Sequence, residues 1–104
     1  MIHHIVMCTL RADHDPAELQ KVMEGLDALR NTLSGFSHFT HGPNQDFEGL
    51  STDCHYAFVC QFADAPALRH YVQDPGHREL GKRLLALCEG GVTGLRVVDM
   101  AETA

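Results

Sequence analysis

The sequence predicts an α+β fold of the ferredoxin-like type, with the element order β-α-β-β-α-β and one antiparallel four-stranded sheet. Four short segments, residues 2–10, 36–41, 54–62 and 92–100, are rich in apolar residues and have the length of strands. Segments with the 3.6-residue apolar period of helices separate the first strand from the second and the third from the fourth. The 104 residues contain no internal repeat and no linker, so residues 1–104 are expected to form a single domain.

The first strand, residues 2–10, is apolar at most positions of both faces. In a ferredoxin-like unit the helices cover one face of the sheet and leave the other bare. A strand that is apolar on both faces therefore predicts that a second copy of the chain covers the bare face. We expect a homodimer in which the two sheets pack together. The alternating sets are His4, Val6, Cys8 and Leu10 on one face, and His3, Ile5 and Met7 on the other.

The helical segment that follows has a clear start signal. Asp15 is the expected N-cap, Pro16 takes the first helical position, and Glu18 is expected to reach back as in a capping box. Gly35 ends the segment. One face of the helix is expected to be buried, because six apolar residues keep the helical period. They are Leu19, Val22, Met23, Leu26, Leu29 and Leu33.

The middle of the chain predicts two strands joined by a polar loop. The strand over residues 36–41 ends at the turn-forming residues 42–44, which are Gly-Pro-Asn. In the polar stretch beyond, Phe47 and Leu50 are the expected anchors of the loop to the core. Residues 54–62 then form the third strand, with aromatic residues and cysteines on one face.

The second helical segment must be broken in two. Asp64 caps a short helix over residues 65–73, and Pro75 interrupts it because proline lacks an N–H and clashes with the preceding turn. With Asp74 before it, Pro75 starts a second helix that runs to about Cys88. A pair of glycines then stops this helix before the last strand.

Charge and composition disfavour several classes of partner. The net charge of −6 argues against binding to nucleic acid or anionic lipid. No apolar run approaches the roughly 20 residues that a membrane span needs, and no leader-like segment opens the sequence, so the expected location is the cytoplasm. The four cysteines show no Cys-x-x-Cys spacing, which favours free thiols in a reducing compartment.

Tyr71 and His77 are candidates for an acid–base pair, because they lie six residues apart across the helix break. Asp74 can accept a hydrogen bond from the His77 N–H as the N-cap of the second helix. The positive end of the helix dipole disfavours a charged imidazole, so a neutral His77 able to accept a proton is expected at pH 7. The alternative is structural: a first-turn surface histidine beside a packed aromatic residue.

Two further histidines, His4 and His55, lie on apolar strands and therefore need polar partners or a pocket. They are expected either to line a pocket or to be satisfied strand histidines. The eight histidines do not predict a metal site: no His-x-x-x-His occurs, and His38 and His41 point to opposite faces of a strand. No glycine-rich nucleotide-binding sequence and no nucleophile elbow is present, so we expect no cofactor.

These motifs together resemble the Dabb family, the stress-responsive dimeric α/β-barrel domains, almost from end to end of the chain. The resemblance implies the ferredoxin-like fold and a homodimer in which two sheets form an α/β barrel. The matching pieces, in order, are His4-Ile5-Val6, Gly42-x-Asn44, Glu48-Gly49-Leu50-Ser51, His55, Tyr71 with Pro75-x-His77, and Val97-Val98-Asp99.

The chain also looks similar to the family's polyketide cyclases of the olivetolic acid cyclase type. That resemblance implies His77 as a general base on a carbon acid and Tyr71 as the donor to the substrate carbonyl. Two departures are evident: Asp74 stands where the cyclase has a second histidine, and the helix residues of the cavity are aliphatic here. The implied substrate-binding residues are His4, Val6, Cys8, Val22, Met23, Leu26, His55, Val59, Leu95 and Val97.

The sequence leaves three functional hypotheses open, and they differ in whether the protein is an enzyme. The first is a cofactor-independent cyclase- or lyase-type enzyme, or a binder, for a small apolar carbonyl compound. The second is a non-enzymatic dimeric protein of structural or stress-response type, in which His77 serves the helix break. The third is a monooxygenase of the wider α/β-barrel superfamily, which the absence of tryptophan disfavours.

Overall fold

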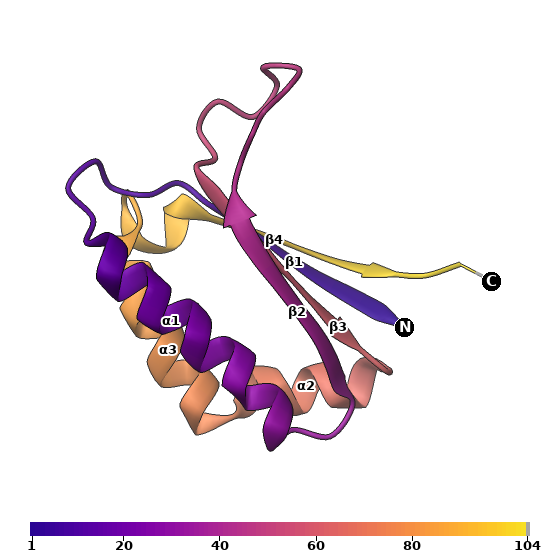
Figure 1. Cartoon of the computed structure of the whole chain (residues 1–104). Helices are drawn as coiled ribbons and strands as arrows, with labels where there is room; N and C mark the ends of the chain where they lie inside the picture. The colour runs from indigo at the N-terminus through magenta and orange to yellow at the C-terminus, as the bar shows by residue number, and fades with distance from the viewer. Residues whose placement is uncertain (104) are drawn as a thin grey trace.

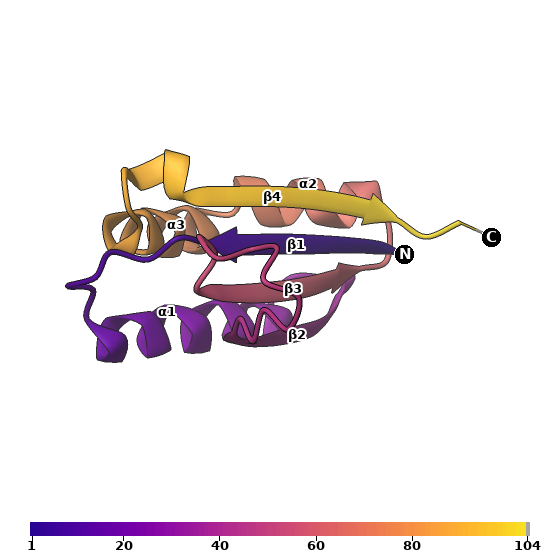
Figure 2. The ribbon, with the colours of Figure 1, turned by 90° about the horizontal axis from the view of Figure 1, so that it is seen from above.

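Four strands form a single antiparallel sheet in the order β2-β3-β1-β4, in a computed structural model that describes residues 1–103 (Figures 1 and 2). This order and the order of elements along the chain confirm the predicted ferredoxin-like α+β fold. The strands are β1 (Ile2–Cys8), β2 (Phe36–Pro43), β3 (Tyr56–Phe62) and β4 (Leu95–Ala101). The helices are α1 (Pro16–Ala28), α2 (Ala65–Gln73) and α3 (Pro75–Leu87), with short 3-10 turns η1 (Leu29–Asn31) and η2 (Gly91–Gly94).

The last strand begins later than its apolar pattern predicts, at Leu95. Gly90 and Gly91 both adopt positive φ angles, of 69° and 64°, and turn the chain into η2. The Thr93 hydroxyl donates back to the Gly90 carbonyl and stabilises this turn (3.1 Å). The prediction that residues 92–94 are strand was therefore wrong, because the glycine pair leads into a helical turn first.

The helix starts follow the predicted capping signals. Asp15, Asp64 and Asp74 each accept a hydrogen bond from a backbone N–H in the first turn of α1, α2 and α3. The expected capping box at Glu18 was wrong. Its carboxylate accepts two hydrogen bonds from Arg83 of α3, at 2.8 and 2.9 Å, and thereby joins α1 to α3.

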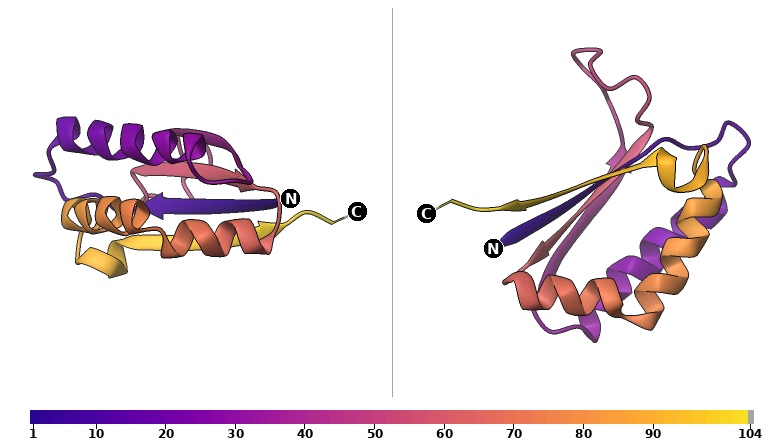
Figure 3. Two further views of the ribbon diagram at one scale, coloured as in Figure 1. Left: turned by 90° about the horizontal axis from the view of Figure 1, so that it is seen from below. Right: turned by 180° about the vertical axis from the view of Figure 1, so that it is seen from behind.

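The two faces of the sheet differ in what covers them. All three helices lie against one face, where apolar side chains of β1 and β3 are buried (Figures 1 and 3). The other face carries no helix and is mainly apolar at its centre, where Ile5 of β1 pairs with Val59 of β3 and Val98 of β4. Apolar residues on this uncovered face are Ile5, Met7, Ala57, Val59, Val98 and Met100.

The loop between β2 and β3 is held by polar side chains. Asn44 donates to the carbonyl groups of Ser51 and Cys54, and Asp46 accepts from the backbone N–H of Ser51. Phe47 and Leu50, the expected anchors, are 94% and 84% exposed, so that prediction was wrong. The side-chain hydrogen bonds replace an apolar anchor, and the two apolar residues project from the loop.

None of the helices formed within residues 1–103 is both long enough and apolar enough to cross a membrane.

Candidate functional site

His77 and Tyr71 lie in contact where α2 gives way to α3. The centroids of the two rings are 4.1 Å apart with an interplanar angle of 43°. Asp74 fixes this geometry because it caps both helices: its N–H donates to the Tyr71 carbonyl, and its carboxylate accepts from the His77 N–H at 3.0 Å. The two rings are therefore in contact across the helix break, whereas the Tyr71 hydroxyl lies beside Cys60.

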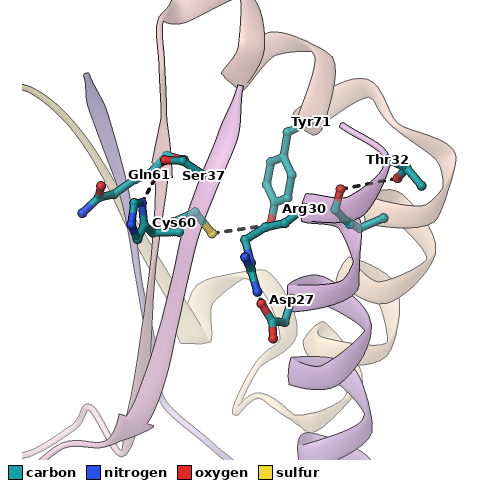
Figure 4. Close-up of polar contacts among 9 residues, drawn as sticks. Asp27, Arg30, Thr32, Ser37, Cys60, Gln61 and Tyr71 are labelled. Carbon is teal, nitrogen blue, oxygen red and sulfur yellow. Dashed lines mark hydrogen bonds and ion pairs between the residues drawn. The ribbon is translucent and has the colours of Figure 1, made fainter. Parts of the chain in front are cut away.

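Tyr71 points from α2 into the interior, between the sheet and α1 (Figure 4). Its side chain is fully buried, and its hydroxyl oxygen lies 3.9 Å from Sγ of Cys60 on β3. Burial, with the nearby Cys60 thiol, raises the pKa of Tyr71. The phenol therefore stays protonated near neutral pH, so it can donate a hydrogen bond or a proton but cannot act as a base.

His77 is half-buried, and its Nδ1 atom is enclosed without a hydrogen-bond partner among residues 1–103. Burial is the largest influence on the ring and lowers the pKa of His77, and His4 acts in the same direction. A backbone group of Val72 and the carboxylate of Asp74 oppose this shift in the pKa without reversing it. The imidazole is therefore neutral near pH 7, with one nitrogen able to accept a proton and with Nδ1 enclosed and unpartnered among residues 1–103.

The lowered pKa of His77 predicts a pH dependence of stability. In the unfolded chain the imidazole takes up a proton near its ordinary value of 6.5, whereas the folded protein resists protonation. The contribution of His77 to the free energy of unfolding is complete when the pH is above the unfolded-state pKa of 6.5. It declines as the pH falls below that pKa. Urea unfolding at about pH 7.5 and about pH 5.5 should show a smaller acid-induced loss in His77→Gln than in the unsubstituted protein. An equal loss in both proteins would contradict this assignment.

His4 extends the site toward the sheet edge. Its ring meets the Tyr71 ring edge-on, with centroids 5.7 Å apart, and its Nδ1 donates to Asp99 on β4 at 2.6 Å. A carboxylate only accepts, so this bond fixes the tautomer of His4. Neither Cys60 as a neighbour of Tyr71 nor Asp99 as the partner of His4 was predicted from the sequence. The adjacent, antiparallel placement of the first and last strands in this fold was the signal that could have found Asp99.

A groove of about 510 Å³ opens beside His77, between α3 and the segment that leads into β4. Of the residues proposed from the sequence, His77 and Leu95 line it. Tyr71 lies behind the His77 ring and does not reach the groove wall. Residues from three elements form the lining: His77, Arg78, Gly81, Lys82 and Leu85 of α3, Val92 of η2 and Leu95 of β4.

The other residues expected around a ligand have four different locations. Five are packed in the core between the sheet and α1: Val6, Cys8, Val22, Met23 and Leu26. Val97 is on the helix side of β4 but 51% exposed at the sheet edge, and Val59 is on the uncovered face. His55 is exposed and accepts a hydrogen bond from the Leu10 N–H through Nδ1. The structure brings neither His55 nor Val59 to the groove beside His77.

Within residues 1–103, no three histidine, cysteine, aspartate or glutamate side chains come together in a way that could hold a metal ion. A neutral imidazole beside a protonated phenol has the groups for proton transfer or hydrogen bonding.

A model of the family described as "Stress responsive A/B Barrel Domain" (Dabb) matches residues 2–101. No curated protein sequence matches the chain.

Solved structures with the same fold include a dimeric ferredoxin-like protein of unknown function from Jannaschia sp. CCS1. It is 37% identical, with a TM-score of 0.92, over 97% of this chain and 98% of that one. The hydroxynitrile lyase from Passiflora edulis is 15% identical, with a TM-score of 0.80, over 99% and 95% of the two chains. SnoaB, a cofactor-independent oxygenase from Streptomyces nogalater, is 19% identical, with a TM-score of 0.75, over 99% and 93%. The likeness to the lyase and the oxygenase is one of fold alone.

Proposed function

This chain belongs to the Dabb family of stress-responsive α/β-barrel domains, and we propose that it acts on, or binds, a small and largely apolar carbonyl compound without a cofactor. The observation that carries the proposal is the position of His77: its neutral imidazole lines a groove, lies against the protonated Tyr71, and keeps an enclosed Nδ1 without a partner among residues 1–103. A buried polar atom without a partner costs stability and is rare, which marks His77 as a candidate for function.

The proposed chemistry is proton abstraction next to a carbonyl group. A ring nitrogen of His77 takes the proton from the carbon, the electrons of the broken C–H bond form the C=C bond of an enolate, and negative charge develops on the carbonyl oxygen. For the Tyr71 hydroxyl to donate to that oxygen, the ligand must enter past the His77 ring, because the hydroxyl lies beside Cys60 in the core and not at the groove wall. A positioned base of this kind contributes about 10²–10⁴-fold to the rate. Return of a proton to the carbon gives exchange with the solvent. If the enolate carbon instead attacks a second carbonyl carbon, a C–C bond forms, the π electrons of that carbonyl pass to its oxygen, and the oxygen takes the proton from the His77 imidazolium, as in a cyclase-type reaction. The reverse of this addition is a lyase-type cleavage.

A homodimer that joins two sheets through their uncovered faces is part of the proposal. The centre of this face is apolar, around Ile5 and Val98, and no element of the described chain covers it. Phe47 and Leu50 project from the neighbouring loop and offer further apolar area to a partner. The Jannaschia protein of the same fold is described as dimeric, which supports this arrangement. A cytoplasmic location also belongs to the proposal, supported by four free cysteines.

The test uses hydrogen–deuterium exchange into 2-nonanone, a neutral apolar ketone, in heavy water, followed by proton NMR. We expect the protein to accelerate exchange at the carbons beside the carbonyl, and His77→Ala and Tyr71→Phe to lose that acceleration. His70→Ala is the matched control, because His70 is an exposed histidine on α2. Exchange no faster than in buffer, or full activity in His77→Ala, would refute the acid–base proposal.

The second candidate is a non-enzymatic dimeric stress-response protein, favoured by the complete burial of Tyr71. Its ring packs on Phe36 and Phe62, with centroids 5.2 and 5.0 Å away, as a core residue would. Under this hypothesis His77→Ala and Tyr71→Phe both lower the melting temperature by several degrees, and neither alters exchange into the ketone. The oxygenase alternative has no comparable observation to support it.

A further inference from the structure

Two cationic side chains flank the groove beside His77. Arg78 and Lys82 are both exposed, and neither takes part in an ion pair within residues 1–103. They are four residues apart on α3, and like charges at this spacing repel one another. An anion placed between them would relieve this repulsion. The chain as a whole has a net charge of −6, so this positive pair is a local exception.

The floor of the groove is open because of a glycine. Gly81 lies in the interior of α3 without a positive φ angle, and a Cβ atom added there would meet no atom within 4 Å. Neither close packing nor backbone geometry therefore requires a glycine, which weakens a helix relative to alanine. His77, Gly81 and Leu85 follow one another at four-residue spacing along α3, so the floor is about 12 Å long.

The opposite wall and the far end of the floor are apolar, formed by Leu85, Val92 and Leu95. The groove thus combines three features along its length: a neutral base at one end, an apolar strip, and a pair of cations on the flank. A neutral ketone would use only the first two. A ligand that carries a carboxylate close to its carbonyl group would use all three.

We propose that the groove binds an extended oxo acid, with its carbonyl at His77, its carboxylate at Arg78 and Lys82, and its apolar tail over Gly81. This inference rests on the proposed function, since it names the class of compound that the same site takes. It adds the requirement for an anionic group, which the acid–base chemistry itself does not need. The carboxylate would be held partly in solvent, by the ends of two flexible side chains.

The test compares 4-oxodecanoate with its methyl ester, which differs only in lacking the charge, by isothermal titration calorimetry. We expect the acid to bind about tenfold more tightly than the ester. Arg78→Gln combined with Lys82→Gln should lower the affinity for the acid to that for the ester and leave binding of the ester unchanged. Arg69→Gln is the matched control, because Arg69 is an exposed arginine on α2 without an ion pair.

The location of the binding site is tested separately with Gly81→Leu, because a leucine side chain would fill the floor of the groove. This variant should lose binding of both the acid and the ester while its melting temperature holds or rises, because leucine favours a helix more than glycine does. Equal affinity of acid and ester, or an acid preference that survives removal of both cations, would overturn the inference. If the protein still catalyses exchange into 2-nonanone in that case, the proposed function stands without it. If exchange and binding both fail, the two proposals fall together.

Discussion

Ile5→Asp is expected to convert the protein from a dimer to a monomer. Ile5 lies at the centre of the uncovered face of the sheet, with Val59 and Val98 as its neighbours on the adjacent strands. In the proposed dimer each Ile5 is buried against the partner, and an unpaired carboxylate in such a place costs several kcal/mol. The dissociation constant should therefore rise by about 10³-fold or more.

Sedimentation velocity over a range of protein concentrations measures this change directly. Val72→Asp is the matched control, because Val72 is 47% exposed on α2, on the helix side of the sheet, and should stay dimeric when substituted. A dimer that persists in Ile5→Asp with unchanged affinity would show that the copies associate through a different surface. A monomer in both variants would point to general destabilisation instead.

The second large effect is expected at Tyr71, where the size and the hydroxyl of the side chain have separable roles. Tyr71→Ala removes a fully buried ring that contacts Phe36, Phe62 and His77, and should cost about 3–5 kcal/mol of unfolding free energy. Tyr71→Phe keeps the ring and loses only a long contact with Cys60, so it should cost less than about 1 kcal/mol.

Urea unfolding measures both values, and exchange into 2-nonanone measures the role of the hydroxyl in the same two proteins. The expected pattern is a stable Tyr71→Phe that has lost most of the exchange activity. A Tyr71→Phe that is stable and fully active would leave Tyr71 with a packing role only. A Tyr71→Ala that loses less than about 1 kcal/mol would contradict the packing described here, because large-to-small changes in a closed core rarely cost so little.

Apart from the overall fold, the features predicted correctly from the sequence are local ones. Asp64 and Asp74 act through hydrogen bonds to residues three positions later, and Pro75 acts on the turn beside it, so the pattern of nearby residues is sufficient to predict them. The contact of Tyr71 with His77 follows from the same short segment. These elements needed no knowledge of how distant strands pair.

The features that were missed or misassigned depend on contacts between distant parts of the chain. Glu18 has the spacing of a capping box, but Arg83 of α3 offers its carboxylate a bidentate partner, and the longer-range contact wins. Phe47 and Leu50 are apolar enough to suggest anchors, yet Asn44 holds the loop through three hydrogen bonds. Which side chain competes successfully at each position depends on the register and packing of the complete sheet.

The site also assembles from contacts of very different sequence separation, and this has a consequence for the order of folding. Tyr71 and His77 are six residues apart, so they can meet as soon as the helix break forms. His4 and Asp99 are 95 residues apart, and their contact requires the first and last strands to pair. Closing so long a loop carries a large entropic cost, which slows the step. A refolding chain should therefore form the contact between His77 and Tyr71 early. The hydrogen bond between His4 and Asp99 should form only when β4 pairs with β1.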